Sequence, residues 1–150
     1  MLRGDQQARG AAGGRRFVVS KLDRDLMRGA GPTAVLQLLS AGEMYGYELV
    51  EQLSRRSDGV LAMGQGTLYP LLYNLESKGL VAAEERVADN GRKRRYYTLT
   101  GKGRARLSAD RERWNELTAA MGQLGVVSRT AIEGLRGSSG ASGAGDGVPA

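Results

Sequence analysis

The sequence predicts a mainly α-helical fold that contains one two-stranded β-hairpin and ends in a long helix. Three observations favour this fold class. Leucines recur at helical spacing in the middle of the chain, an alternating pattern surrounds Asn90-Gly91, and a long proline-free helical pattern follows Thr100.

The composition argues against several kinds of chemistry before any motif is considered. The 150 residues include neither cysteine nor histidine, which excludes disulfides, thiolate nucleophiles and the Ser-His-Asp and Cys-His catalytic sets. Acid–base work by carboxylates stays open, but we expect no enzyme, no cofactor and no metal site. No apolar run approaches the roughly 20 residues that span a bilayer, and residues 1–16 do not resemble a signal peptide. We therefore expect a soluble, cytoplasmic protein.

Both ends of the chain have the composition of disordered segments. Residues 1–24 carry six basic and two acidic side chains. Residues 126–150 are rich in Gly and Ser and cannot bury enough apolar surface to offset the entropy of ordering. We expect solvated tails, and for the basic N-terminal arm contact with nucleic acid is the alternative interpretation.

Two helices are predicted before the leucine-rich segment. The first covers about Leu26 to Ala41, and its dense leucines indicate burial on more than one side. The second follows Tyr45-Gly46-Tyr47, has Leu49 and Leu53 on one face, and ends at Ser57-Asp58-Gly59.

The third helix has the clearest periodicity of the chain. Leu68, Leu71, Leu72 and Leu75 form one apolar stripe, and Gly79 is expected to end the helix. Its N-cap is either Gly64 or Thr67, and Pro70 falls harmlessly in the first turn only if the cap is Thr67. The opposite face can donate hydrogen bonds to phosphates and base edges. Its members are Gln65, Thr67, Tyr69, Tyr73, Asn74 and Lys78.

The next segment has the period of β-strands. Leu80 to Val87 and Arg94 to Leu99 are predicted strands on either side of Asp89-Asn90-Gly91. Asn-Gly suits a tight hairpin turn in which both central residues have positive φ.

A strongly basic cluster covers this hairpin and the chain beyond it. Between Arg86 and Arg106 there are eight positive side chains and one negative, a net +7 in a protein of net charge +6. Such charges repel one another unless an anion is present, and the phosphate backbone of nucleic acid is the anion that arginine binds in a bidentate manner. A solvated charged turn is the alternative for the cluster taken alone. The phosphate-binding candidates at the hairpin tip are Arg92, Lys93, Arg94 and Arg95.

Thr100 is expected to cap a last helix that runs to about Leu124. Its apolar residues follow a heptad in which Asp110 alone interrupts the seam. This pattern predicts packing against a helix of a second chain. The seam residues are Leu107, Trp114, Leu117, Met121 and Leu124.

A helix pair, an amphipathic third helix and a hairpin with a basic tip are typical of a winged helix-turn-helix. We expect this DNA-binding domain to cover residues 25–99 and a C-terminal dimerisation helix to cover 100–125.

Several spaced motifs resemble the PadR family of bacterial transcriptional regulators, and the resemblance covers about residues 24–125. They are Tyr45-Gly46-Tyr47-Glu48-Leu49, the run from Gly66 to Leu72 with Leu75-Glu76 and Gly79-Leu80-Val81, the run from Gly91 to Thr100, and Gly103 and Trp114.

The resemblance implies a dimeric winged-helix repressor of the compact subgroup, which dimerises through one C-terminal helix and releases double-stranded DNA when a small planar effector binds. It implies that Tyr69 contacts the DNA backbone and that Tyr97 and Leu99 are core residues of the second wing strand. We add Tyr47 to the predicted DNA contacts. Tyr73-Asn74 stands where the family commonly has a basic residue or histidine, so the base preference is expected to differ.

Trp114 has two interpretations. It is either a structural anchor of the dimer seam or, as in some family members, an indole that stacks on aromatic effectors. In the second case its expected neighbours are Leu26, Ala30, Thr33, Thr118 and Met121.

Two other functions remain as alternatives. The cluster from Arg92 to Arg95 could clamp an anionic nucleotide second messenger, or the winged fold could serve as a protein-interaction adaptor. Catalysis is the poorest alternative, because no catalytic constellation or phosphate loop is present.

Overall fold

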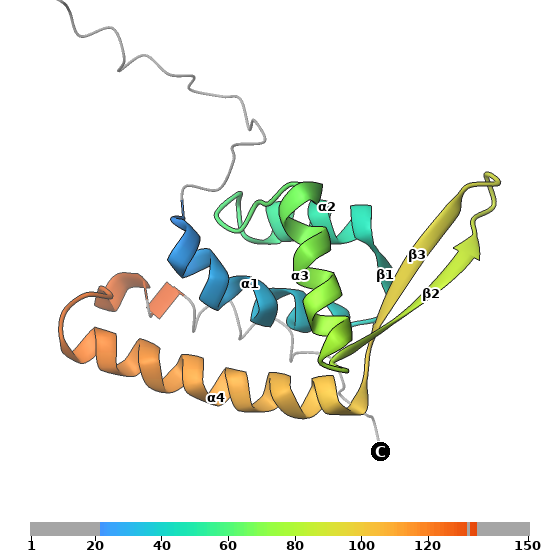
Figure 1. Cartoon of the computed structure of the whole chain (residues 1–150). Helices are drawn as coiled ribbons and strands as arrows, with labels where there is room; N and C mark the ends of the chain where they lie inside the picture. The colour runs from blue at the N-terminus through green and yellow to red at the C-terminus, as the bar shows by residue number, and fades with distance from the viewer. Residues whose placement is uncertain (1–21, 132, 135–150) are drawn as a thin grey trace, which may run out of the picture. The chain divides into compact units, whose positions relative to one another are not determined.

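The structure, a computed structural model, describes residues 22–131 together with 133 and 134. Contacts divide the chain after Leu107 into two units, so the last helix begins in the first unit and continues in the second. The elements in chain order are α1 Arg24–Leu39, β1 Met44–Tyr45, α2 Gly46–Arg56, α3 Gln65–Ser77, β2 Val81–Val87, β3 Lys93–Leu99 and α4 Gly101–Gln123 (Figure 1).

The mainly helical, winged fold predicted from the sequence is confirmed, with shifts at its borders. The predicted N-terminal arm lies outside the described residues except at its end, where Arg24 already belongs to α1. The predicted C-terminal tail lies partly outside them, and residues 129–131 within it are helical.

α1 begins two residues earlier than the leucine pattern indicated. The Asp23 carboxylate accepts hydrogen bonds from the backbone N–H groups of Asp25 and Leu26, at 2.9 and 3.0 Å. An aspartate in this position satisfies N–H groups that have no partner within the helix. This cap fixes the start of the helix at Arg24.

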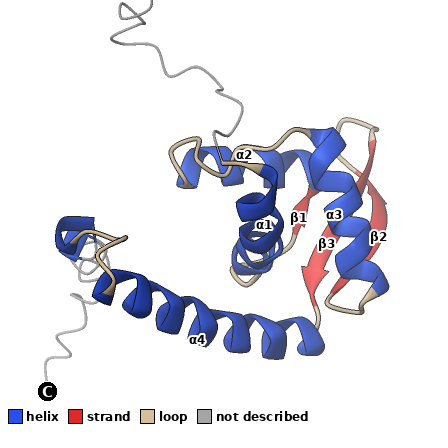
Figure 2. Cartoon of the chain, turned by 60° about the vertical axis from the view of Figure 1, so that its left-hand side comes forward, coloured by secondary structure: helices blue, strands red, loops and turns tan. Residues whose placement is uncertain are grey.

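The sheet has three strands, whereas the sequence indicated two. The strand order is β1-β3-β2 and both pairings are antiparallel (Figure 2). β1 contributes only Met44 and Tyr45, which lie opposite Tyr97 and Tyr96. Two residues are too short to show an alternating pattern, so this strand could not be predicted from periodicity.

The hairpin turn also differs from the expected one. Of its residues only Gly91 has a positive φ, at 80°. The Gly91 N–H donates to the Ala88 carbonyl at 2.8 Å, and the Ala88 N–H donates to the Arg92 carbonyl at 2.8 Å. This is a three-residue loop, a turn closed by a glycine bulge, in which Asn90 keeps negative φ. The Asn90 side chain instead accepts from the Arg92 N–H.

α3 starts at the earlier of its two candidate caps. Gly64 is the N-cap, which places Pro70 inside the helix rather than in its first turn. The missing proline N–H leaves the Gly66 carbonyl without its helical partner. At the other end Gly79 has φ 73°, and the N–H groups of Gly79 and Leu80 donate to Glu76 and Leu75. This glycine-ended motif stops α3 and directs the chain into β2.

The joint between the sheet and α4 is tight. The Thr100 hydroxyl donates to the Gly79 carbonyl at 2.7 Å and accepts from the Gly103 N–H at 2.9 Å, which confirms the predicted cap. A Cβ on Gly103 would lie 2.0 Å from the Leu80 carbonyl oxygen. The residue must therefore be glycine for the helix to approach the sheet this closely.

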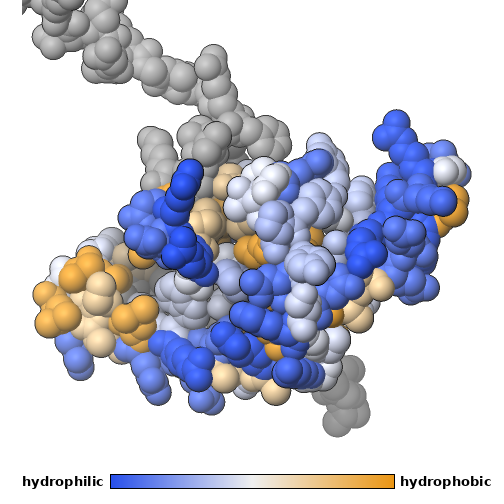
Figure 3. All heavy atoms as spheres, viewed as in Figure 1, coloured by the Kyte–Doolittle hydropathy of each residue, from blue (hydrophilic) through white to orange (hydrophobic). Residues whose placement is uncertain are grey.

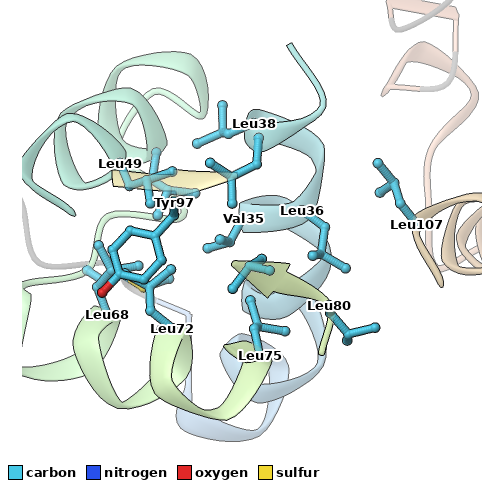
Figure 4. Close-up of a cluster of buried hydrophobic side chains, with 14 residues drawn as sticks. Val35, Leu36, Leu38, Leu49, Leu68, Leu72, Leu75, Leu80, Tyr97 and Leu107 are labelled. Carbon is cyan, nitrogen blue, oxygen red and sulfur yellow. The ribbon is translucent and has the colours of Figure 1, made fainter. Parts of the chain in front are cut away.

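The core lies between the helices of the first unit and one face of the sheet. Figure 4 shows side chains of α1, α2, α3 and β3 meeting there, among them Val35, Leu49, Leu68 and Tyr97, each at most 3% exposed. Leu99 packs against this cluster from its edge. Tyr97 is thus the buried wing residue that the family resemblance implied.

In the described part of the chain, no helix has both the length and the apolar character required to cross a bilayer.

Candidate nucleic-acid interface

α3 presents the polar face that its sequence predicted. Leu68, Leu72 and Leu75 are buried, while Leu71 is only partly buried at the edge of the core. The six residues proposed for the opposite face are all exposed, with Tyr73 at 73% and Tyr69 at 42%. The hydrophobic side of α3 therefore fixes which polar groups the helix offers to a partner.

An open groove of about 610 Å³ brings part of this face together with the wing, by which we mean β2, β3 and their turn, residues 81–99. Predicted residues that line it are Tyr47, Gln65, Tyr69 and the four cations from Arg92 to Arg95. Thr67, Tyr73, Asn74 and Lys78 lie outside its lining. Sequence reasoning missed three lining residues, Tyr45, Gly46 and Glu85.

The Tyr69 ring sits over the start of α2, and only a glycine leaves room for it. A Cβ on Gly46 would lie 2.7 Å from the Tyr69 hydroxyl oxygen and 2.9 Å from its Cε1 atom. The Tyr-Gly-Tyr motif and the α3 tyrosine thus form one structural unit. Sequence reasoning missed this contact, because the Tyr-Gly-Tyr motif shows that a glycine is present but not that it faces Tyr69 of another helix.

The outer face of the sheet carries alternating guanidinium and aromatic groups. Arg94 lies over the Tyr45 ring, with its Cζ 4.3 Å from the ring centre, and Arg86 lies over Tyr96 at 4.4 Å. The two rings meet edge to face at 5.7 Å. Arg86 also makes a two-pronged hydrogen bond to Glu43, which lowers the pKa of that carboxyl and raises the pKa of Arg86. These contacts stabilise Arg86 and Arg94, two like charges that lie opposite each other in the β2–β3 pairing.

On the inner face, the wing is bound to α3. Both carboxylate oxygens of Glu76 accept from one Arg95 nitrogen, at 2.9 and 3.0 Å, and this hydrogen bonding raises the pKa of Arg95. The Arg95 guanidinium also lies 5.9 Å from the Tyr97 ring centre. Burial raises the pKa of the Tyr97 hydroxyl.

The four consecutive cations of the predicted tip therefore have different surroundings. Arg95 is engaged with Glu76, and Arg94 covers an aromatic ring. Arg92 and Lys93 are exposed, and their side chains form no ion pair with any residue that the structure describes. All four stay predicted phosphate contacts, and the structure adds that their present partners differ. The cluster also extends beyond the wing, since Lys102, Arg104 and Arg106 lie on the first turns of α4.

The predicted effector and dimer residues fall in both units. Leu107 is only 2% exposed and belongs to the core of its own chain, so its assignment to the dimer seam is corrected. Leu26 is exposed on α1, with Ala30 and Thr33 partly buried one and two turns later. In the second unit Trp114, Leu117 and Leu124 are exposed, and Thr118 and Met121 are partly buried. Asp110 is 8% exposed and pairs with Arg113 at 3.8 Å.

Apolar side chains gather toward the C-terminal end of α4 (Figure 3). The exposed ones include Leu117 on α4 and Leu124 and Val126 just after its end. Within the described residues no group of three or more carboxylates is arranged to hold a metal ion.

Comparison with known proteins is consistent across sequence and structure. The sequence model of the Transcriptional regulator PadR-like family matches residues 35–109. A transcriptional regulator of Mycobacterium tuberculosis is 40% identical over 111 residues, which cover 74% of this chain and 98% of that protein.

Two solved structures show the same relationship. A PadR family transcriptional regulator from Eggerthella lenta is 34% identical with a TM-score of 0.59, covering 67% of this chain and 85% of that one. A PadR-like transcriptional regulator from Bacillus cereus is 27% identical with a TM-score of 0.61, covering 69% and 99%.

Proposed function

This chain belongs to the PadR-like family of transcriptional regulators, which are not enzymes, and we propose that it is a sequence-specific DNA-binding repressor that acts as a homodimer. A cytoplasmic location, where a bacterial regulator meets its DNA, is part of this proposal.

One observation carries the DNA-binding part. The polar side chains of α3 are exposed beside a groove whose lining includes two cations without an ion-pair partner among the described residues, Arg92 and Lys93. In the proposed complex α3 enters the major groove, where Gln65 and Asn74 can contact base edges. The Tyr69 hydroxyl and the wing cations contact phosphate. Phosphate contacts position the protein, and base contacts select the sequence.

The dimer and the effector rest on the second unit. Trp114 and Leu117 on α4 and Leu124 directly after its end are exposed large apolar side chains, and burying them against a second copy would stabilise a dimer. We propose that a small planar or aromatic effector stacks on the Trp114 indole and modulates DNA binding from there.

The test begins with selection of bound genomic fragments by the purified protein, followed by titration of the recovered site at several salt concentrations. Each lost phosphate contact should flatten the slope of log K against log salt by about 0.9. Replacing both Arg92 and Lys93 with Gln should therefore weaken binding and flatten the slope by about 1.8 for each bound protomer.

The matched control carries Gln at Arg55 and Arg56, which removes the same charge from the end of α2 opposite Tyr47. The control should keep the wild-type slope. Equal slopes for both double variants would show that the wing does not bind phosphate. An indole fluorescence that stays unchanged in a saturated effector complex would reject stacking on Trp114.

A nucleotide second messenger is the second candidate ligand, because the groove combines tyrosine rings with free cations. It predicts that a free cyclic dinucleotide displaces DNA from the wild-type protein and not from the Arg92/Lys93 double variant. If the protein binds selected genomic sites and the free nucleotide does not displace them, the result favours the repressor over the nucleotide-binding function.

A further inference from the structure

The five cations of the wing have unequal partners. Arg86 is hydrogen-bonded to Glu43 and also forms an ion pair with Glu84 at 3.5 Å, and Arg95 is hydrogen-bonded to Glu76. Arg94 lies over the Tyr45 ring, whereas Arg92 and Lys93 keep exposed side chains without an ion pair in the described part of the chain. The sequence separations are 43 and 19 residues, so both pairs join distant segments.

The two pairs hold the wing from opposite faces. In the β2–β3 ladder Arg95 lies opposite Glu85, and Arg86 lies opposite Arg94. Side chains of facing residues share a face and successive residues alternate, so Arg86 and Arg95 project to different sides of the hairpin. Glu76 reaches one side from α3, and Glu43 reaches the other from the segment before β1.

We propose that Glu43 and Glu76 are positioning residues of the DNA interface. This inference rests on the proposed function. The two carboxylates keep Arg86 and Arg95 bound within the protein and fix the direction of the wing relative to α3. Arg92 and Lys93 then remain as the cations that the wing offers to phosphate.

The physical advantage is a defined wing before DNA arrives. A single exposed ion pair contributes little to stability, but two pairs on opposite faces, each backed by an arginine over a tyrosine ring, act as a network. A pre-ordered wing loses less conformational freedom on binding. The same pairs also limit non-specific binding to DNA, because an arginine without its glutamate partner would be available to contact a phosphate of any duplex.

The experiment compares Glu43→Gln, Glu76→Gln and the double variant with Glu112→Gln. Glu112 is the matched control: it is exposed on α4, carries the same charge, lies outside the lining of the groove and has no ion-pair partner among the described residues. The first readout is backbone amide hydrogen exchange of residues 86–95 in the DNA-free protein. The second is the salt dependence of binding to a random-sequence duplex.

We expect exchange in the hairpin to accelerate several-fold in the double variant and to stay at the wild-type rate in Glu112→Gln. We expect the slope of log K against log salt to steepen by about 0.9 in Glu76→Gln, which frees Arg95, and by less in Glu43→Gln, because Arg86 keeps its ion pair with Glu84. The preference for the selected site over random DNA should fall.

The inference is overturned if the double variant matches Glu112→Gln in exchange and in slope. Faster exchange with an unchanged slope overturns the part of the inference in which the glutamates keep the arginines from contacting phosphate. If no protein in the series binds any DNA, the proposed function fails, and the exchange experiment still decides whether the glutamates hold the wing.

Discussion

At the scale of single residues, the close approaches in this protein depend on glycines whose role the sequence does not reveal. Gly46 admits the Tyr69 ring and Gly103 admits the Leu80 carbonyl. Both residues belong to the motifs that resemble the PadR family. Their spacing could be recognised from the sequence, but the partner atoms lie on other elements and only the folded chain brings them together.

We predict that Gly103→Ala destabilises the first unit strongly. The new Cβ would lie 2.0 Å from the Leu80 carbonyl oxygen and 2.7 Å from Leu99 Cδ1, and the backbone oxygen cannot rotate away. Overpacking of this kind costs about 1–3 kcal/mol, and a backbone clash belongs at the upper end. Urea unfolding followed by circular dichroism measures the loss.

Gly101→Ala is the matched control, because nothing lies within 4 Å of its added Cβ. It should be neutral or stabilising by up to about 1 kcal/mol, since alanine favours a helix over glycine. Equal stability of the two variants would contradict the close approach at Gly103.

A second residue-scale prediction concerns pH. Burial raises the pKa of the Tyr97 hydroxyl above its ordinary value of about 10. The folded state therefore favours the neutral phenol, so the associated stability is present below pH 10 and is lost as the pH rises through the folded-state pKa. Tyr97→Phe should lose less unfolding free energy between pH 8 and pH 11 than the wild type.

Urea titrations at the two pH values provide the comparison. Replacing the exposed Tyr73 with Phe is the control, and it should keep the wild-type pH profile. A Tyr97→Phe profile that is as steep as the wild type would show that this hydroxyl does not govern alkaline unfolding.

At the scale of elements, the sequence predicted the features that depend on long periodic segments or on caps formed by neighbouring residues. The leucine stripe of α3 and the Thr100 cap of α4 follow from nearby residues alone, and both are confirmed. β1 could not be predicted, because two residues show no periodicity and because its partners, Tyr96 and Tyr97, lie more than 50 residues later. The ion pairs of the wing arginines could not be predicted either, because their glutamate partners are also distant in the sequence. Charge patterns show where arginines cluster but not which carboxylates contact them.

The interior proline of α3 yields an element-scale prediction. Pro70 is exposed, and its missing N–H leaves the Gly66 carbonyl without a helical partner. Pro70→Ala restores that hydrogen bond, which stabilises the folded state. It also gives the unfolded chain more conformational freedom, which offsets part of the gain, so we expect a net increase of about 1–2 kcal/mol in unfolding free energy. Thermal and urea unfolding should agree on the gain with an unchanged m-value. A loss of stability would mean that the ring packs more favourably than the restored hydrogen bond.

At the scale of the whole molecule, the division into two units separates two tasks. The first unit holds the core, the polar face of α3 and the wing. The second carries exposed apolar side chains on α4. Because Leu107 already belongs to the core of the first unit, the proposed dimer seam begins later than the heptad pattern indicated, and Trp114 becomes its first large residue.

This shorter seam gives the last prediction. Leu117 and Leu124 are 50% and 77% exposed, and burying one leucine side chain contributes roughly 1.5–3 kcal/mol. Replacing both with Asp removes four such side chains from a symmetric dimer and buries charge in their place. We expect the dimer dissociation constant to rise at least about 100-fold, since each 1.4 kcal/mol is a factor of ten.

Sedimentation equilibrium measures the dimer dissociation constant, while an unchanged far-ultraviolet spectrum and unchanged melting of the first unit show that the fold is intact. Glu116→Gln, an exposed neighbour on the same helix, should remain dimeric. A double variant that stays dimeric at micromolar concentration would place the interface elsewhere on the chain, and a wild type that is monomeric at that concentration would refute the dimer itself.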